Sequence, residues 1–296
     1  MSTASGDTAG SKLWRQIRTA LLGFIGVATG VYLLIVAVMF FAQRSLQYQP
    51  DPRFVLPNVE GVPIQVVRLT TPDHQRLVAW FLPPQDGRPV ILHLNGNGGN
   101  LGDQRGRWRR IASAGVGFLA VAYRGYGGST GHPTEAGLLT DARTGYAFLA
   151  ARYPSQRIVI HGYSLGSGLA VRLAAERPAR ALVLEAPYTS TLEVAELEYP
   201  LLPVPLLMLD RYLSRDWIGK VHIPVLIIHG DRDSVIPFRM GQRLYALANA
   251  PKLFVRMAGS DHNTLVRDGL YDHVWPFLGV PPPPVESLDD RGQLTP

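Results

Sequence analysis

The chain has no cysteine among its 296 residues. Disulfide bonds, thiolate metal sites and a cysteine nucleophile are therefore excluded, although this absence does not decide the compartment. Histidine pairs at the spacing of zinc ligands on a helix are also missing, so we expect no catalytic metal and no cofactor. No run of lysine and arginine is interleaved with aromatic residues, which argues against a nucleic-acid partner.

Acidic residues are the scarcer charged type. The 23 Asp and Glu against 29 Lys and Arg give a net charge of +6. An ordinary basic surface explains this excess, and attraction to anionic lipid head groups is a second interpretation. The hydrophobic content of 46% can fill the core of one large α/β domain or two small ones.

Residues 20–42 carry no charge at all. At 1.5 Å per residue a helix of this length spans roughly 34 Å, enough to cross a bilayer core of about 30 Å. A cleaved signal peptide is the competing interpretation, but its apolar region usually has about 7–15 residues and ends in small ones. This run ends on Met39, Phe40 and Phe41. We therefore predict an uncleaved transmembrane anchor.

Charged residues flank the predicted anchor on both sides: Lys12, Arg15 and Arg18 before it, and Arg44, Asp51 and Arg53 after it. The positive-inside bias favours a cytoplasmic segment over residues 1–19 and a domain on the far side, which would be the periplasmic face of a bacterial inner membrane. Gly26 and Gly30 form a GxxxG pattern that pairs some membrane helices. Because this spacing arises easily by chance in an apolar helix, it leaves the oligomeric state open.

A proline-rich connector over residues 43–63 leads into an alternation of short apolar runs and helical patterns. Two leading strands are predicted at 64–69 and 77–82, and buried strands at 90–94, 116–123, 158–161, 181–184, 225–229 and 253–257. Helices are predicted at 135–152, 167–176 and 238–248. This order predicts an α/β fold, a mostly parallel eight-stranded sheet with helices on both faces, in a domain over residues 64–279. The tail, residues 280–296, is predicted to be disordered.

Residues 191–217 are longer than a simple crossover between strands and contain the apolar stretch YPLLPVPLLML at 199–209. One interpretation is a crossover helix with packing loops. The other is a small cap over the site that contacts an acyl chain or the bilayer.

Ser164 lies in the sequence GYSLG, between a predicted strand and a helical pattern rich in small residues. This is the G-x-S-x-G motif in its required context of strand, sharp turn and helix. Glycines on both sides allow the serine a strained backbone close to neighbouring chain, and the helix N-terminus favours an anion there. Ser164 is therefore the candidate nucleophile.

A serine hydroxyl needs a base, and the base needs an orienting acid. Asp231 and Asp233 follow the predicted strand at 225–229, and carboxyl ends of strands are where open α/β sheets place their sites. We predict Asp233 as the acid and Asp231 as a turn residue that binds loop amides. His262 follows the last predicted strand and is the predicted base.

An oxyanion requires backbone N–H donors that already point at it. Leu165, directly after Ser164, should supply one. By position, Asn97 in the glycine-rich loop 95–100 should supply the second N–H. Alternatively, this loop is a flexible turn without a catalytic part. A phosphate-binding loop is a further alternative, but its G-x-x-x-x-G-K-[ST] signature is absent. Of the remaining histidines, His93 and His161 are expected to be buried and hydrogen-bonded. His229 is expected to brace the acid loop, the segment with Asp231 and Asp233.

Three stretches resemble the BEM46-like group of the α/β-hydrolase superfamily, which includes α/β-hydrolase domain proteins 13 and 17: LNGNGGN at 94–100, AYRGYGGSTGHPTEAGLLTDA at 122–142 and GYSLGSG at 162–168. The resemblance extends over roughly residues 66–277 and implies the α/β-hydrolase fold. It also implies Ser164 as nucleophile, Asp233 as acid and His262 as base, with the amides of Asn97 and Leu165 as oxyanion donors. An N-terminal hydrophobic anchor occurs in this group as well.

The chain departs from the group's pattern at two positions. The group usually has His where Asn95 stands and Asp where Ala122 stands. Neither position belongs to the implied triad, so we expect an active protein whose oxyanion loop is hydrogen-bonded differently. The group contains protein depalmitoylases, but their palmitoylation-dependent recruitment elements cannot apply to a chain without cysteine.

Together these patterns predict a membrane-anchored serine hydrolase that cleaves carboxylic esters or thioesters through an acyl-enzyme, with membrane lipid nearby and a lipid-like acyl substrate as a hypothesis. One alternative is a serine peptidase of the same fold, although such enzymes often carry a large extra domain. The other is a non-catalytic binding or signalling protein on a hydrolase scaffold. The complete set of Ser164, Asp233 and His262 argues against the latter.

Overall fold

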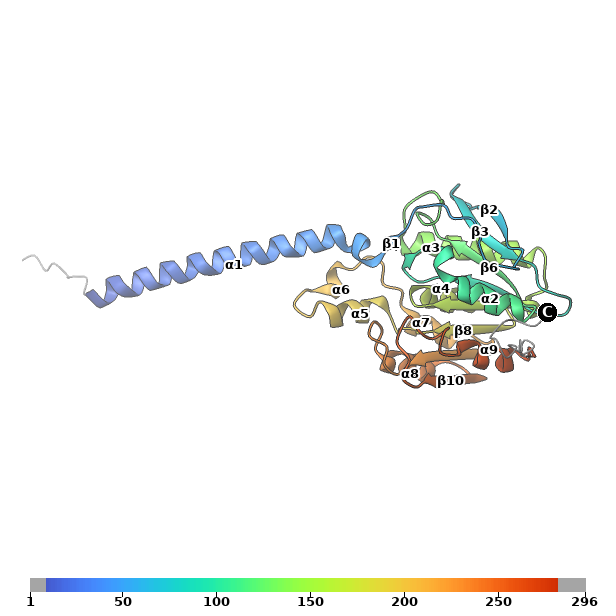
Figure 1. The fold of residues 1–296 in the computed structure, drawn as a ribbon. Helices are drawn as coiled ribbons and strands as arrows, with labels where there is room; N and C mark the ends of the chain where they lie inside the picture. Colours follow the sequence, from blue (N-terminus) through green and yellow to red (C-terminus); the bar gives the residue numbers. More distant parts are fainter. Residues whose placement is uncertain (1–8, 282–296) are drawn as a thin grey trace, which may run out of the picture. The chain divides into compact units, whose positions relative to one another are not determined.

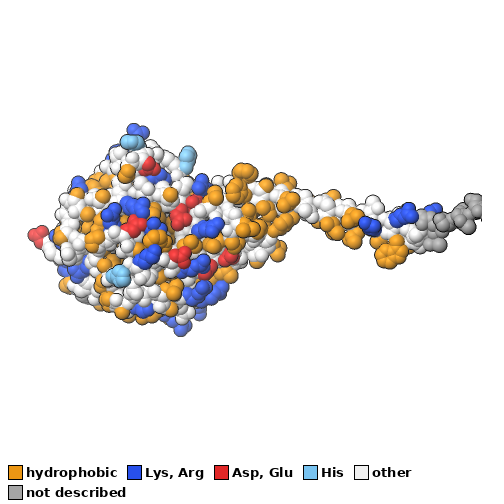
Figure 2. All heavy atoms as spheres, turned by 180° about the vertical axis from the view of Figure 1, so that it is seen from behind, with side chains coloured by type: hydrophobic (Ala, Val, Ile, Leu, Met, Phe, Trp, Pro, Cys, Tyr) orange, Lys and Arg blue, Asp and Glu red, His pale blue; other side chains and the backbone are white. Residues whose placement is uncertain are grey.

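The computed structural model describes residues 9–281. Contacts between residues divide the chain into two units, with the boundary between Leu46 and Gln47. The described part of the first unit is one helix, α1 (Ala9–Gln47) (Figure 1). The last residue of this helix, Gln47, already belongs to the second unit. By length and composition Gly10–Gln47 is able to cross a membrane, and its most apolar stretch is not buried by protein. Basic side chains gather toward its N-terminal end (Figure 2).

The predicted span 20–42 lies inside α1, and the helix extends beyond it in both directions. No proline precedes Pro50, so nothing in the chain forces the helix to stop at the edge of the apolar run. Residues 9–19 and the start of the predicted connector are consequently helical. Residues 1–8 lie outside the described part of the chain, and the cytoplasmic placement of 1–19 stays a prediction.

The second unit is built on an eight-stranded sheet in the order β10-β9-β8-β7-β4-β6-β3-β2 (Figure 1). Its strands are β2 (Gln65–Thr70), β3 (Arg76–Leu82), β4 (Val90–Leu94), β6 (Gly117–Ala122), β7 (Ile158–Tyr163), β8 (Ala181–Glu185), β9 (Val225–Gly230) and β10 (Lys252–Met257). Neighbouring strands are parallel, except that β3 runs antiparallel to β2 and β6. The predicted mostly parallel sheet is confirmed.

Burial differs between the middle and the edge of this sheet. β4, β6, β8 and β9 are buried at every position, as strands covered on both faces should be. β10 was predicted to be buried, and this is wrong: Leu253 is 46% exposed. The strand lies at the edge of the sheet, where it has a neighbouring strand on one side only.

Helices cover both faces of the sheet, and β6 shows how. Phe118 stacks on Trp108 of α2 (Arg105–Ser113) with ring centroids 4.7 Å apart. The next residue, Leu119, lies against Gly145 of α3 (Glu135–Ala150). Because successive side chains of a strand point to opposite faces, α2 and α3 lie on opposite sides. α4 (Leu165–Glu176) packs beside α3, and α9 (Leu270–Leu278) reaches α2 through a hydrogen bond between Arg107 and Tyr271.

Two further features complete the second unit. Between β8 and β9, residues 191–217 form three short helices, α5 (Thr191–Glu198), α6 (Val204–Leu207) and α7 (Ser214–Trp217), instead of one crossover helix (Figure 1). After β9 follows α8 (Phe238–Leu247), close to its predicted bounds. Of the tail predicted to be disordered, only residues 280 and 281 lie inside the described part of the chain.

Candidate active site

Ser164 lies at the sharp turn between β7 and α4, at the carboxyl edge of the sheet. Its backbone has φ 50° and ψ −119°, a conformation that costs a non-glycine residue on the order of 1–3 kcal/mol. The Ser164 N–H donates to the Glu185 carbonyl at 3.0 Å, which holds the turn against β8. A Cβ on Gly166 would collide with the Leu94 carbonyl, and one on Gly162 would lie 2.6 Å from the Ala170 Cβ. The flanking glycines are thus required by close approach of the chain.

A continuous line of hydrogen bonds leads from Ser164 to a carboxylate. His262 Nε2 lies 2.9 Å from Ser164 Oγ, and His262 Nδ1 lies 2.8 Å from Asp233 Oδ2. Ser164 and His262 are buried, and the Asp233 side chain is 0% exposed. The three residues come from loops after β7, β9 and β10, which end at the same edge of the sheet. This is the geometry in which an imidazole can take a proton from a serine hydroxyl while a carboxylate orients it.

The Asp233 carboxylate is held in its ionised form. Burial opposes the charge, but hydrogen bonds from His229 and His262 outweigh it and hold the pKa of Asp233 well below its usual range. Val235 and Ile236 donate their backbone N–H groups to Asp233 Oδ1 at 2.9 and 2.7 Å. One carboxylate oxygen is therefore occupied by the loop, and the other faces the imidazoles.

His229 braces this acid loop, as predicted. Its Nε2 lies 3.0 Å from the Ile236 carbonyl and 3.2 Å from Asp233 Oδ2. Because a carbonyl can only accept, Nε2 carries the proton. Asp231 has the other predicted role: it binds Arg256 and accepts the Gly259 N–H at 2.7 Å.

The predicted oxyanion loop lies against the serine turn. A Cβ built on Gly96 would lie 3.5 Å from the Ser164 Cβ and 3.2 Å from the Tyr163 ring. Within residues 9–281, the N–H groups of Asn97 and Leu165 donate to no protein acceptor. Leu165 is the first residue of α4, where backbone N–H groups have no partner inside the helix. Both predicted donors are thus available to an anionic oxygen.

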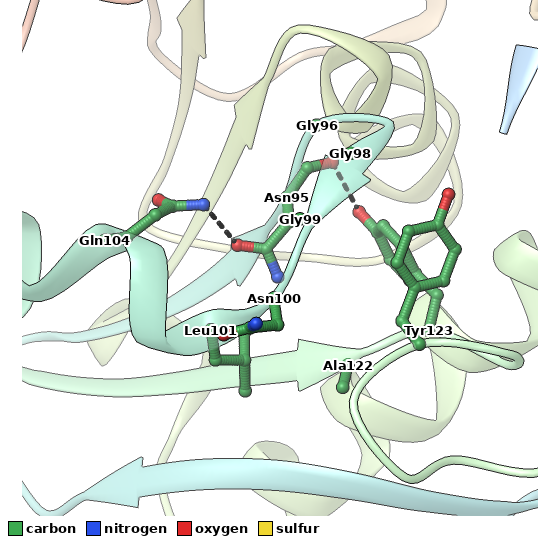
Figure 3. Close-up of a pocket in the computed structure, with 10 residues that line it drawn as sticks. Asn95, Gly96, Gly98, Gly99, Asn100, Leu101, Gln104, Ala122 and Tyr123 are labelled. Carbon is green, nitrogen blue, oxygen red and sulfur yellow. Dashed lines mark hydrogen bonds between the residues drawn. The ribbon is translucent and has the colours of Figure 1, made fainter. Parts of the chain in front are cut away.

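The unusual Asn95 is tied into the protein by its side chain. Its Nδ2 donates to the Val121 carbonyl at 3.1 Å, its Oδ1 accepts from Gln104 at 3.0 Å, and its carbonyl accepts the Tyr123 hydroxyl at 3.0 Å. Figure 3 shows the last two bonds beside a small pocket lined by this loop, Ala122 and Tyr123. Asn95 is therefore held by a local network, and the expected difference from the group's loop stays a prediction.

A buried ionic cluster under the site was not foreseen. Arg107 of α2 makes a bidentate contact with Glu185, at 2.7 and 3.0 Å, and His161 Nε2 lies 3.2 Å from the same carboxylate. Burial opposes the charge of Glu185, but Arg107 and His161 outweigh it and lower the pKa of Glu185 to about 2. The one sequence signal was an acidic residue at the end of an apolar strand. Since Glu185 also accepts the Ser164 N–H, the cluster supports the serine turn.

The prediction that His93 is buried is confirmed, but the prediction that it is hydrogen-bonded is wrong. It is fully buried, but neither ring nitrogen has a hydrogen-bond partner among the described residues. Its ring packs edge-on against Trp108 and His161, with centroids 5.3 and 4.9 Å apart. Burial lowers the pKa of His93 well below its usual value, so it is a neutral core residue. No group of side chains within residues 9–281 has the arrangement of a metal site.

The chain is similar to several known proteins. A family model described as serine aminopeptidase, S33, matches residues 85–204. Protein Rv2307c of Mycobacterium tuberculosis is 38% identical over 247 residues, 80% of this chain and 85% of that protein. Lysophosphatidylserine lipase ABHD12 of Danio rerio is 36% identical over 188 residues, 57% of this chain and 49% of that protein.

Solved structures share the fold. An α/β hydrolase of Vibrio vulnificus has a TM-score of 0.67 at 23% identity, over 81% of this chain and 93% of that one. An esterase of Pyrococcus furiosus has a TM-score of 0.65 at 19% identity, over 78% and 98%. The narrower resemblance to domain proteins 13 and 17 stays a prediction. With this sheet, these relatives and these structures, the chain belongs to the α/β-hydrolase superfamily and is a hydrolase by family.

Proposed function

We propose that the protein is a membrane-anchored serine hydrolase that cleaves carboxylic esters or thioesters through an acyl-enzyme on Ser164. The observation that carries this proposal is the unbroken hydrogen-bonded line from Ser164 Oγ through His262 to Asp233. The N–H groups of Asn97 and Leu165 support it, because they have no acceptor in the described part of the chain and a tetrahedral intermediate needs such donors.

In this mechanism Ser164 Oγ attacks the acyl carbonyl while His262 Nε2 takes its proton. The carbonyl oxygen becomes an oxyanion that accepts the N–H groups of Asn97 and Leu165. The imidazolium, stabilised by Asp233, then protonates the leaving alcohol or thiol, and the acyl group stays on Ser164. Water enters, gives a proton to His262 and attacks the acyl carbonyl. The tetrahedral intermediate then collapses, His262 returns the proton to Ser164 Oγ, and the carboxylic acid is released.

The proposed location is a membrane, through an anchor at residues 20–42. The basic residues before this run and the positive-inside rule favour a cytoplasmic N-terminus and a periplasmic catalytic domain. A basic patch for anionic lipids has less support, because acidic and basic side chains are interspersed over the face shown in Figure 2.

A lipid-like acyl substrate is supported by residues 191–217, which we propose form a cap. Leu201 and Leu206 are 84% and 83% exposed, and apolar side chains that are exposed close together mark interaction surfaces. Gln47, the first residue of the second unit, donates through Nε2 to the Asp210 carbonyl at 3.0 Å, so the start of this unit is bonded to the proposed cap. The lipase named among the relatives acts on a lysophospholipid, which agrees with this substrate class.

The test is active-site labelling of the full chain in detergent with a fluorophosphonate, followed by a panel of acyl esters, thioesters and peptides. We expect the wild type to be labelled and Ser164→Ala not to be. Absence of labelling in the folded wild type would contradict the proposal, and hydrolysis of peptides alone would favour the peptidase alternative, which the family description also suggests.

The hypothesis that residues 191–217 form a lipid-facing cap is tested by comparing a double variant with the wild type. Leu201→Ser with Leu206→Ser should lower hydrolysis of long-chain esters in vesicles while short soluble esters are cleaved at the wild-type rate. Equal turnover of long-chain esters by both proteins would remove the support for a lipid-facing cap.

A further inference from the structure

We propose that the strap, defined as residues Gln47, Tyr48, Gln49 and Pro50, positions Asn97 for catalysis. The chain that leaves the proposed membrane helix would then be part of the active-site support as well as a tether. This inference rests on the proposed function, because the role of Asn97 as an oxyanion donor belongs to it.

Among the residues that the structure describes, Asn97 makes three hydrogen bonds, and two of them join it to the strap. The Gln49 N–H donates to the Asn97 carbonyl at 2.9 Å, and Asn97 Nδ2 donates to the Gln47 carbonyl at 3.1 Å. The third is the Tyr126 hydroxyl, which donates to the Asn97 carbonyl at 2.7 Å. The same segments form a small parallel ladder between β1 (Gln49–Pro50) and β5 (Gly98–Gly99).

The bond to Gln47 serves both partners. Gln47 ends α1, and the last carbonyl groups of a helix have no partner inside it. The Asn97 side chain supplies one of these missing donors. The strap thereby holds the side chain and the carbonyl of Asn97, and neither of these two bonds uses its backbone N–H.

This support matters because the loop around Asn97 is intrinsically loose. Gly96 precedes it, Gly98 and Gly99 follow it, and Gly99 has φ 73°. Glycines lose more conformational freedom on ordering than other residues, so such a loop does not hold one geometry unaided. An oxyanion donor contributes to catalysis only when it is already aimed at the developing charge. Contacts from outside the loop are therefore needed.

The strap is itself anchored firmly in the second unit. Tyr48 is 2% exposed, and its hydroxyl lies 2.9 Å from that of Tyr212. Burial raises the pKa of Tyr48 far above its usual value, so the phenol stays neutral and this bond is kept at all physiological pH values. Gln47 Nε2 also binds the Asp210 carbonyl. The strap is thus fixed to the second unit by its own contacts, and it can hold Asn97 in one position.

The decisive experiment compares two full-chain variants at one exposed position. Gln49→Pro removes the N–H that Asn97 accepts, whereas Gln49→Ala keeps it. With a 4-nitrophenyl acyl ester in detergent, we expect Gln49→Pro to lose about tenfold or more in kcat with KM changed less than threefold, since an oxyanion contact acts in the transition state. Gln49→Ala should retain the kcat of the wild type, and the melting temperatures of the two variants should agree.

Asn97→Ala provides a second test if proline at position 49 lowers the melting temperature. It keeps the backbone N–H but cannot bind the Gln47 carbonyl, so it should also lose kcat, with KM and folding retained. A merely structural strap would lower stability and leave kcat unchanged.

Equal kcat for Gln49→Pro and Gln49→Ala, or a wild-type kcat in Asn97→Ala, would overturn the role of the strap while Ser164-dependent hydrolysis still stands. A wild type without Ser164-dependent activity would instead overturn the proposed function. The two failures are therefore distinguishable.

Discussion

The Tyr163 hydroxyl donates to Asn263 Oδ1 at 2.7 Å, which joins the residue before Ser164 to the residue after His262. The Tyr163 ring also lies 5.5 Å from the His262 ring. The end of β7, next to the proposed nucleophile, is thus bonded directly to the loop of the proposed base, 100 residues away in the chain.

Removing this tie should misalign the base without unfolding the protein. Tyr163→Phe keeps the ring and loses the bond, so we expect kcat/KM to fall about 2- to 10-fold, the equivalent of roughly 0.5–1.5 kcal/mol. Asn263→Ala should have a similar effect, and the double variant should be little worse than either single one. Fully additive losses would show that the bond does not act as a unit.

Substitution of the two aspartates of the acid loop should affect kcat very differently. Asp233→Asn removes the charge beside His262 and favours the wrong imidazole tautomer, so we expect kcat to fall on the order of 10³–10⁴-fold. Asp231→Asn is the matched control, since its partners are Arg256 and the Gly259 N–H at the surface. We expect it to keep nearly full activity. The reverse ranking in steady-state kinetics would assign the acid to Asp231.

Adding a Cβ at Gly166 and at Gly106 should have opposite effects on stability, because the first glycine is crowded and the second is not. Gly166→Ala would drive a Cβ into the Leu94 carbonyl, so we expect a loss of about 1–3 kcal/mol in the free energy of unfolding together with lost activity. Gly106 lies in α2 with nothing within 4 Å of a built Cβ. Gly106→Ala should therefore stabilise the protein by roughly 0.5–1 kcal/mol. Denaturant titration of both variants measures the difference.

The buried carboxylate of Glu185 should make stability depend on acid pH. Its pKa is about 2 in the folded protein against an ordinary 4.5. Because the folded pKa is depressed, this contribution is fully present above pH 4.5 and is lost as pH falls toward 2. Glu185→Gln leaves Arg107 buried without its counter-ion, which should cost about 3–5 kcal/mol at neutral pH.

The same variant checks the sign of that dependence. Unfolding free energies measured between pH 5 and pH 2 should fall less steeply for Glu185→Gln than for the wild type. Parallel curves would show that Glu185 does not titrate in this window.

Much of the fold was predictable because its signals are local. Eight apolar runs bounded by turns predicted the strands within one to two residues at most ends, and 90–94 coincides with β4. The short helices between β8 and β9 were harder, because prolines interrupt their pattern. The exposed face of β10 was missed because strand order across the sheet is not visible in one sequence.

What the sequence by itself determined is the set of candidate residues and their order: Ser164 in a glycine-flanked turn, Asp233, then His262, behind an uncharged run long enough to span a bilayer. Each of these features lies within a short window, where backbone sterics and hydrophobic pattern suffice. Only the tertiary structure decided which residues support them. Asn97 meets Gln47, Arg107 meets Glu185 and Tyr163 meets Asn263 across 50, 78 and 100 residues of chain. Such partners carry no mutual signal in the sequence. Tyr163 and Asn263 meet because β7 and β10 run parallel and end at one edge of a common sheet, whereas Gln47 and Arg107 reach their partners from the helices α1 and α2.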